Sequence, residues 1–206
     1  MRILITAGPT REAIDAVRYI SNRSSGRMGA GLTAASLRQG HETTLIVGPV
    51  SVPMPDGVRR IEVETAQQMH DAVMAEFPRH DLLIMAAAVA DYRPKHASAG
   101  KLPRGGSLTI ELEATDDIAA AAGRMKRPDQ RTVGFSLEGD GGVDRARQKL
   151  HRKSFDLIVY NPVETMERDD IGPILVFPDG RQEEIPKSAK DDFADLLVRR
   201  AIELFS

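Results

Sequence analysis

A loop dense in basic and polar side chains leads directly into a helix of small residues in the stretch RYISNRSSGRMGAGLTAAS, residues 18–36. Guanidinium groups bind phosphates and carboxylates through paired, charge-assisted hydrogen bonds, and serine and asparagine side chains add neutral donors. This loop has more capacity for anions than helix packing requires, although a role in surface solubility could explain two of its arginines. The side chains concerned are those of Arg11, Arg18, Asn22, Arg23, Ser24, Ser25 and Arg27.

Three glycines, Gly26, Gly29 and Gly31, open the helix that follows, downstream of a Gly-Pro-Thr turn at residues 8–10. In an open α/β sheet, ligands bind outside the carboxyl ends of the strands, where helix N-termini present free N–H groups to anions. The spacing is G-x-x-G-x-G and not the G-x-G-x-x-G of dinucleotide-binding enzymes. A phosphate or nucleotide site and close packing of the helix on a strand are therefore both open interpretations.

A nicotinamide-dependent oxidoreductase is the first alternative for such a pattern. Short-chain dehydrogenases use a tyrosine with a lysine four residues later, and none of Tyr19, Tyr92 and Tyr160 has a lysine at that spacing. The second predicted strand ends in Val-Gly-Pro at residues 47–49, without the acidic residue that would bind a ribose diol. The sequence therefore argues against this class.

Length and composition favour an ordinary globular protein of one domain. The chain has 206 residues, of which 41% are hydrophobic and 28% charged, and its net charge of -2 gives no reason to expect a nucleic-acid or membrane partner. There is no cysteine, which excludes disulfides and thiolate metal sites and suits a cytoplasmic location. No apolar run approaches a membrane span, and we expect no secretory signal.

Short apolar runs rich in β-formers alternate with helical patterns, which is typical of βαβ units. Near-continuous apolar strands such as DLLIMAAA indicate a sheet covered on both faces. The predicted fold is therefore α/β, a Rossmann-like, doubly wound and mainly parallel sheet. A capping box formed by Thr65 and Gln68 predicts a helix over 65–77. The predicted strands are residues 3–7, 43–47, 59–63, 81–88, 132–136 and 156–161.

The pattern changes after Asn161. Residues 173–185 read as a small β-hairpin around a Pro-Asp-Gly turn, and residues 189–205 as an amphipathic terminal helix. We therefore expect a single ligand-binding domain over 1–206, with a Rossmann-like core at 1–161 and a hairpin and terminal helix appended at 162–206.

Residues 89–107, VADYRPKHASAGKLPRGGS, have no periodicity and are rich in glycine, proline and basic residues. Loops of this length in compact domains are usually functional or disordered. We expect a mobile lid that carries Lys101.

Several motifs, in this order and spacing, resemble the bacterial phosphopantothenoylcysteine synthetase (phosphopantothenate-cysteine ligase) family. They are ITAGPTRE, DAVRYISNRSSGRMG, TLIVGPV, AAAVADYRP, the Lys-Leu pair at 101–102, VGF and ARQKLHRK. The resemblance extends from residue 1 to about residue 161 and is weaker beyond it. It implies a Rossmann-like ligase, usually a homodimer, that joins 4'-phosphopantothenate to L-cysteine in coenzyme A synthesis. In this family CTP and Mg²⁺ drive the reaction through an acyl-cytidylate, and a separate or fused flavin-dependent decarboxylase is a natural partner.

The resemblance also implies site residues. Lys149 and Lys153 match lysines that contact nucleotide phosphates, Asp91 matches a contact to the base and sugar, and Phe135 matches a residue that packs on the cytosine ring. Without the resemblance, the two lysines would indicate a solvated face of a helix. A phenylalanine at the end of a strand would indicate an ordinary residue of the hydrophobic core. The implied nucleotide-binding set is Met85, Ala86, Ala87, Asp91, Lys101, Asp116, Asp117, Ile118, Phe135, Lys149 and Lys153.

On the substrate side, the resemblance implies contacts to phosphopantothenate from Gly8, Arg18, Asn22 and Ala88. Lys101 and Asn22 match the catalytic positions. A lysine suits the charge that develops as pyrophosphate departs, and a neutral amide can orient an acyl group without adding charge.

The chain departs from the family pattern at several places. It has TDDI at residues 115–118 where Asn-Pro-Asp-Ile is usual, and KLPR at residues 101–104 in place of a lysine-rich run. A role of Thr115 as a helix N-cap would also explain the TDDI motif. GFSLEG and ETMERDDIGP also differ from the usual segments. The alternative function is therefore a catalytically weakened, nucleotide-binding regulatory or assembly module of the same fold.

Overall fold

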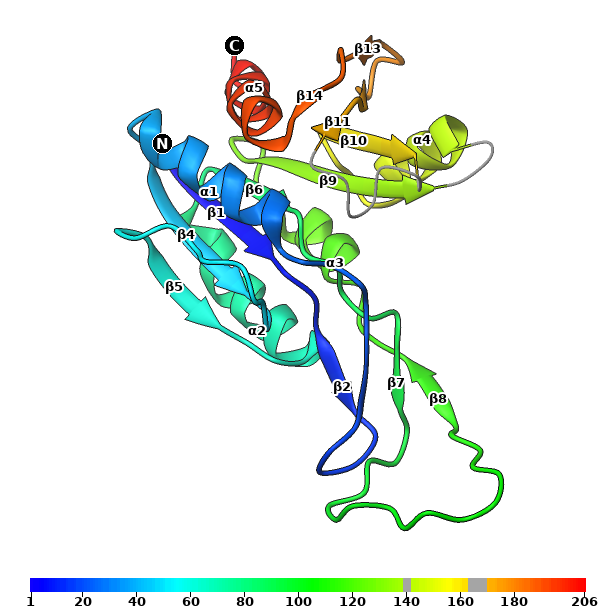
Figure 1. Ribbon diagram of the computed structural model, residues 1–206. Coiled ribbons are helices and arrows are strands. Elements are labelled where there is room, and N and C mark those ends of the chain that lie inside the picture. Colours follow the sequence, from blue (N-terminus) through cyan, green and yellow to red (C-terminus); the bar gives the residue numbers. More distant parts are fainter. Residues whose placement is uncertain (139–141, 163–169) are drawn as a thin grey trace.

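The computed structural model describes residues 1–138, 142–162 and 170–206, and these residues build an eight-stranded sheet with helices on both faces (Figure 1). Six adjacent strands are parallel, and the two at one edge are antiparallel. In spatial order they are β13 (Gln182–Glu184), β12 (Ile174–Val176), β10 (Leu157–Pro162), β9 (Arg131–Glu138), β6 (Leu82–Met85), β1 (Arg2–Ala7), β4 (Glu42–Val47) and β5 (Arg59–Glu62). The predicted Rossmann-like α/β class is confirmed.

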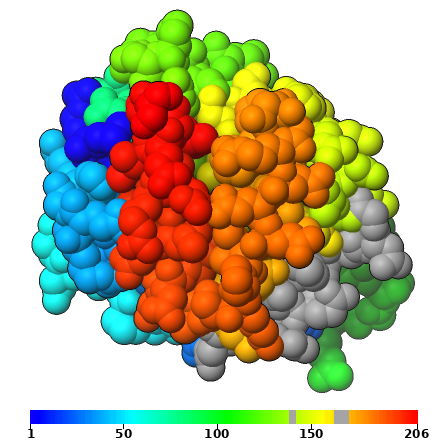
Figure 2. All heavy atoms as spheres, turned by 90° about the horizontal axis from the view of Figure 1, so that it is seen from above, coloured from blue at the N-terminus to red at the C-terminus, as the bar shows by residue number. Residues whose placement is uncertain are grey.

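Alternate side chains of the central strands enter cores on opposite faces of the sheet. Ile3 and Ile5 pack with α1 (Arg27–Arg38) and α5 (Lys190–Glu203), whereas Leu4 packs with α2 (Ala66–Glu76) and α3 (Ile118–Met125). The helix α4 (Gly142–Arg152) covers β10 on the latter face. Figure 2 shows α5, in red, lying between the N-terminal part of the chain and the C-terminal hairpin. Both faces are covered, as the apolar strands predict.

Most predicted elements are present with small shifts. The Thr65 hydroxyl accepts a bond from the backbone N–H of Gln68, and the Gln68 side chain accepts one in return from the N–H of Thr65, so the predicted capping box exists. The predicted C-terminal hairpin is β12 and β13, and it extends the main sheet by pairing with β10. No helix in the described ranges is long and apolar enough to cross a membrane.

The predicted strand over 81–88 is wrong at its end. β6 stops at Met85, after which Ala86 N–H donates to Thr6 O at 3.1 Å and Ala88 N–H to Gly8 O at 2.9 Å. The backbone follows Gly8, which leaves β1 through a left-handed conformation with φ of +76°. Residues 86–88 thus run beside residues 6–10 at the carboxyl edge of the sheet, beyond the regular strand and with one isolated parallel bridge between Pro9 and Ala88.

Two short antiparallel ribbons that the sequence analysis missed project from the body at one end of the molecule (Figure 1). One pairs β2 (Arg11–Ala13) with β3 (Tyr19–Ser21), and the other pairs β7 (Tyr92–Pro94) with β8 (Leu112–Ala114). The segment 89–107, for which the sequence analysis predicted no strand, therefore contains β7 near its start. A third small pair joins β11 (Asp170–Ile171) to β14 (Ser188–Ala189).

Close packing explains two of the three glycines that open α1. A Cβ on Gly29 would lie 2.2 Å from Ala7 Cβ on β1, and a Cβ on Gly31 would lie 3.1 Å from Asp191 Oδ1 on α5. Gly26 differs, because it has φ of +81° and its Cβ would meet Val50 Cγ1 at 2.5 Å. The glycine motif thus serves helix packing at Gly29 and Gly31 and a left-handed turn at Gly26.

We predict that Gly29→Ala lowers the free energy of unfolding by about 1–3 kcal/mol, the usual cost of overpacking, because α1 must move away from β1. Urea denaturation measures this. Gly106→Ala is the control, since nothing lies within 4 Å of its Cβ position and its φ is not positive, and its midpoint should be nearly unchanged. Equal midpoints for both variants would contradict the close packing of α1 on β1.

Candidate functional site

A large cavity lies at the carboxyl edge of the central parallel strands, with a volume of about 1010 Å³. Its walls come from the loop before α1, the loop after β6, the start of α3, α4 with the residue after it, and the ends of β9 and β10. This is the place where open α/β sheets bind ligands. The predicted site residues among its walls are Asn22, Met85, Ala86, Ala87, Ala88, Asp91, Asp116, Asp117, Ile118, Phe135, Lys149 and Lys153.

The first turn of α1 faces this cavity without a side-chain cap. Gly26 occupies the N-cap position, the first turn has no acidic residue, and Ser24 and Ser25 hydroxyls approach the N–H groups of Gly26 and Arg27 only at 3.4 Å. Uncapped N–H groups at a helix N-terminus attract anions. This end of the cavity is therefore suited to a phosphate or carboxylate.

Asn22 ties the loop before α1 to the loop after β6. Its Nδ2 donates to the carbonyl oxygens of Ala88 and Val89 at 2.9 and 3.0 Å, although the residue as a whole is exposed. The amide thus holds two walls of the cavity together. This is a positioning role, in addition to the substrate contact that the sequence resemblance implies.

Basic side chains at the end of α4 line the opposite wall. Lys149 Nζ donates to Phe135 O at 2.8 Å, and Lys153 Nζ lies 3.0 Å from Asp117 Oδ1. Lys153 follows the last residue of α4, so the prediction that both lysines lie within one helix is off by one residue. Positive charge here also complements the negative C-terminal end of the helix dipole. Phe135 lines the cavity and packs on the core at the same time.

Asp117, and not Thr115, is the N-cap of α3. Its Oδ1 accepts a bond from Ala120 N–H at 3.0 Å, whereas the Thr115 hydroxyl donates to Ala90 O at 2.6 Å. Burial raises the pKa of Asp117, but the Ala120 N–H and the Lys153 ammonium outweigh it and hold this pKa below its usual value. Asp117 is therefore ionised and paired with a lysine that a nucleotide phosphate could also bind.

The structure does not bring Arg18 and Lys101 into the cavity of their own chain, and Gly8 lies behind its wall. Arg18 Nε donates to Asp15 Oδ2 at 3.0 Å, and its Nη2 donates to Leu102 O at 3.3 Å. Lys101 is exposed in the loop between β7 and β8, which Figure 1 shows extending away from the body. Arg11 also lies outside the cavity, stacked 4.5 Å from the centre of the Tyr19 ring. The two arginines of the loop that do line the cavity are Arg23 and Arg27.

Asp15 joins the two projecting ribbons. Its buried carboxylate accepts bonds from the N–H groups of Val17 and Arg18, both at 2.8 Å, and of Leu102 at 3.1 Å, as well as from the Arg18 guanidinium. The Arg18 side chain is the main cause that lowers the pKa of Asp15, and the three N–H donors add to it. Asp15 and its partner Arg18 thus together hold Leu102, the residue next to Lys101.

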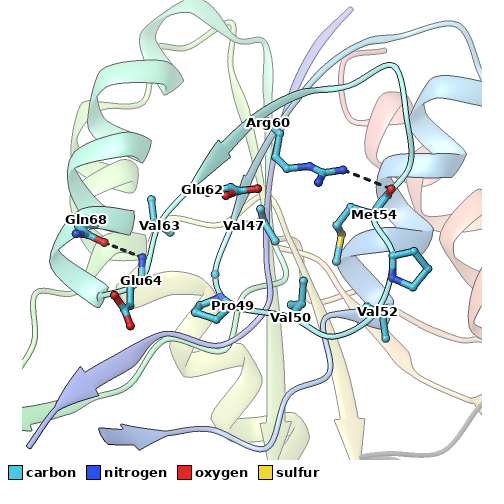
Figure 3. Close-up of a pocket in the computed structure, with 12 residues that line it drawn as sticks. Val47, Pro49, Val50, Val52, Met54, Arg60, Glu62, Val63, Glu64 and Gln68 are labelled. Atoms are coloured by element: carbon cyan, nitrogen blue, oxygen red, sulfur yellow. Dashed lines mark hydrogen bonds between the residues drawn. The ribbon is translucent and has the colours of Figure 1, made fainter. Parts of the chain in front are cut away.

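A smaller cavity of about 570 Å³ lies between the 48–54 loop and the end of β5. Figure 3 shows its apolar walls, with Val50 and Met54 on one side, and Arg60 and Glu62 among its polar side chains. None of the predicted site residues lines it. Its contribution to the large cavity is indirect, because Val50 packs against Gly8 and Gly26.

Sequence reasoning missed the part of the large cavity that the C-terminal third of the chain supplies. These residues are Arg152, Asn161, Ile171 and Lys190. A polar residue ending an apolar strand was a visible signal for Asn161, since strand ends meet at the ligand-binding edge. Lys190 had no local signal, because the packing of α5 on the core and the pairing of β11 with β14 place it there.

The described residues contain no group of three or more His, Asp or Glu side chains that could hold a metal ion. Asp91, Asp116 and Asp117 line the cavity without forming such a group. The described side chains therefore do not build a resident metal centre.

We predict that Asp15→Asn increases the rate of tryptic cleavage after Lys101 or Arg104 several-fold, because the neutral amide loses its ion pair with Arg18 and cannot accept all the bonds that hold Leu102. Asp129→Asn, which removes an exposed pair with Arg127 elsewhere, is the matched control. If the two variants are cleaved at the rate of the unaltered protein, Asp15 does not restrain this segment.

Comparisons with known proteins agree with this geometry. Residues 1–204 match the family described as DNA/pantothenate metabolism flavoprotein C-terminal domain. The chain is 41% identical over 204 residues to the coenzyme A biosynthesis bifunctional protein CoaBC of Vibrio cholerae, covering 96% of this chain and 51% of that protein. It thus spans about half the length of the curated relatives it matches.

Two solved structures share the fold. The C-terminal domain of a CoaBC protein superposes with a TM-score of 0.85 at 37% identity, over 98% of this chain and 95% of that one. A Cab2 mutant, H337A, in complex with phosphopantothenate-cysteine superposes with a TM-score of 0.71 at 18% identity, over 98% and 87%. At the second identity the likeness concerns the fold alone.

Proposed function

Because the chain belongs to the DNA/pantothenate metabolism flavoprotein C-terminal domain family, we propose that it is a phosphopantothenate-cysteine ligase of coenzyme A biosynthesis. It joins 4'-phosphopantothenate to L-cysteine and uses CTP through an acyl-cytidylate. The observation that carries this proposal is that one cavity gathers all the predicted nucleotide residues except Lys101, together with Asn22 and Ala88. The same proposal includes a cytoplasmic location. It also includes a separate flavin-dependent decarboxylase as the partner that catalyses the next step of the pathway.

The first half-reaction activates the substrate carboxylate. A carboxylate oxygen attacks the α-phosphorus of CTP, the new O–P bond forms, and the bond to pyrophosphate breaks with its electron pair on the leaving group. Lys149 and Lys153 stabilise the phosphates as charge moves to pyrophosphate. Lys153 exchanges its ion pair with Asp117 for one with the nucleotide, since both ligands compete for one ammonium.

The second half-reaction forms the amide. The cysteine nitrogen attacks the acyl carbon, the C–N bond forms, and CMP leaves with the electron pair of the broken C–O bond while the nitrogen loses a proton. Asn22 keeps the loop before α1 against residues 88–89, where the acyl group lies in this proposal. Mg²⁺ enters with the nucleotide phosphates, as it commonly does, and we assign it no side-chain ligands.

The assay is incubation with 4'-phosphopantothenate, L-cysteine, Mg²⁺ and each nucleoside triphosphate in turn, with pyrophosphate and the condensed product measured together. We expect both products with CTP, and neither when phosphopantothenate is omitted. Nucleotide binding without turnover for any triphosphate would instead favour the weakened binding module that the motif departures suggest.

We further propose a homodimer in which Arg18 and Lys101 of one subunit act at the cavity of the other. Neither side chain reaches its own cavity, and both lie on the projecting ribbons that Asp15 joins. These ribbons also expose large apolar side chains, which a second copy of the chain would cover. They are Val17 at 61%, Tyr19 at 47%, Tyr92 at 56%, Leu108 at 59% and Leu112 at 44% of full exposure. Closure of the segment over 89–107 then carries Lys101 onto the partner's nucleotide.

Subunit mixing tests this arrangement. Arg18→Gln and Lys149→Gln should each reduce turnover strongly, but a mixture of the two variants should recover up to about a quarter of the activity, because half of the dimers are mixed and each has one intact site. Sedimentation should show a dimer for each variant. If the mixture stays as inactive as its components, Arg18 acts within its own chain.

A further inference from the structure

Asn161 carries a buried hydrogen-bond acceptor that has no partner among the residues that the structure describes. The residue lies in β10 and is only 8% exposed, and its Oδ1 accepts no hydrogen bond from any of these residues. A buried polar atom without a partner destabilises the folded protein, so such atoms in native structures call for an explanation. Asn161 also lines the large cavity, so the simplest explanation is that a bound ligand donates a hydrogen bond to this oxygen.

The side chain of Asn161 lies on the face of the sheet that α1 and α5 cover. Along β10, Val159 packs into the core beneath these helices and Ile158 into the core of the opposite face. Alternation in a strand therefore places Asn161 on the same face as Val159. It pairs in register with Leu137 of β9, two residues beyond Phe135 toward the carboxyl edge.

Lys190 lines the same cavity from the first position of α5. The ladder between β11 and β14 holds the chain just before it, with Asp170 opposite Ala189 and the buried Ile171 opposite Ser188. A basic residue is unfavourable at a helix N-terminus, because the helix dipole is positive there. Arg27 begins α1 in the same unfavourable way and lines the same cavity.

We propose that Asn161 and Lys190 form the binding subsite for the amino-acid substrate, so that Oδ1 of Asn161 accepts a hydrogen bond from the amine and the Lys190 ammonium binds the carboxylate. This inference rests on the proposed function. That reaction has three reactants, and the motifs assign residues to the nucleotide and to phosphopantothenate but none to the amino acid. A zwitterion needs an acceptor for its amine and a cation for its carboxylate, and the C-terminal part of the chain supplies one of each to the same cavity.

The subsite has a defined task in amide formation. The amine must attack as a neutral group with its lone pair directed at the acyl carbon. An amide oxygen that accepts one N–H holds the nitrogen in one orientation and does not take its proton. A carboxylate bound at Lys190 fixes the other end of the amino acid. Analogues without the carboxylate should therefore bind without any contribution from Lys190.

The experiment compares L-cysteine with cysteamine, which has the same amine and thiol but no carboxylate. The enzyme is first mixed with phosphopantothenate, CTP and Mg²⁺ and pyrophosphate release is measured; the amine is then added and amide formation is followed. The variants are Lys190→Met and Asn161→Leu, with Arg199→Met as the control on an exposed position of the same helix.

Lys190→Met should raise the KM for L-cysteine by about tenfold or more, the effect of one charge-assisted contact, and leave that for cysteamine unchanged. Asn161→Leu should slow amide formation with both amines. Pyrophosphate release before the amine is added should be normal in both variants, which also shows that they are folded. The Arg199→Met control should match the unaltered protein throughout.

Other outcomes would overturn the subsite. If Lys190→Met impairs pyrophosphate release or CTP binding, the lysine serves phosphates instead. An equal effect on L-cysteine and cysteamine, or no effect on either, would show that Lys190 does not bind the carboxylate. Failure of the unaltered protein to release pyrophosphate in the first stage is a different result, because it would refute the proposed function itself.

Discussion

The approach of α1 to the carboxyl end of β1 is the constraint on which the site depends. Gly29 lets the helix backbone come against Ala7, and Gly26 turns the chain through a left-handed conformation beneath Val50. Any side chain at either position would push the helix away from the sheet. The consequence is an uncapped helix N-terminus directed at the cavity, where its N–H groups and the positive end of the dipole meet negative charge. Packing and ligand binding are therefore two results of one geometry.

Around this fixed helix end, opposite walls of the cavity contribute complementary groups. One wall has the polar loop before α1, which Asn22 fastens to residues 88–89. The other has the basic end of α4, where Lys153 is held by the ionised Asp117 until a competing anion arrives. The ribbons that carry Arg18 and Lys101 point elsewhere, and the buried Asp15 makes them one unit. A single chain thus presents a cavity and, outside it, a separate set of cations, and this separation is the reason for the proposed homodimer.

Local patterns predicted the fold well, because each depends only on residues that are neighbours in the sequence. Examples are the apolar strands, the Thr65 capping box and the Pro-Asp-Gly hairpin. Most of the residues that line the cavity had been implied by the family resemblance, whereas sheet geometry alone predicted only that a site would lie at the carboxyl ends of the strands. The two ribbons were not, because strands as short as β2 and β7 have too few residues for an alternating pattern. Lys190 was missed because long-range contacts place it, namely the packing of α5 on the core and the β11–β14 pairing. The sequence also assigned Arg18 and Lys101 to the site, but neither side chain lines the cavity of its own chain in this structure.

In the proposed reaction, the carboxylate of phosphopantothenate attacks the α-phosphate of CTP in this cavity. Phosphopantothenate labelled with ¹⁸O in its carboxylate gives a direct test, with the isotope followed by mass spectrometry in the nucleotide and in pyrophosphate after one turnover. We expect one labelled oxygen in the phosphate of CMP, left there when cysteine takes the acyl group, and none in pyrophosphate. Label in pyrophosphate or in free phosphate, or unlabelled CMP beside the condensed product, would contradict it.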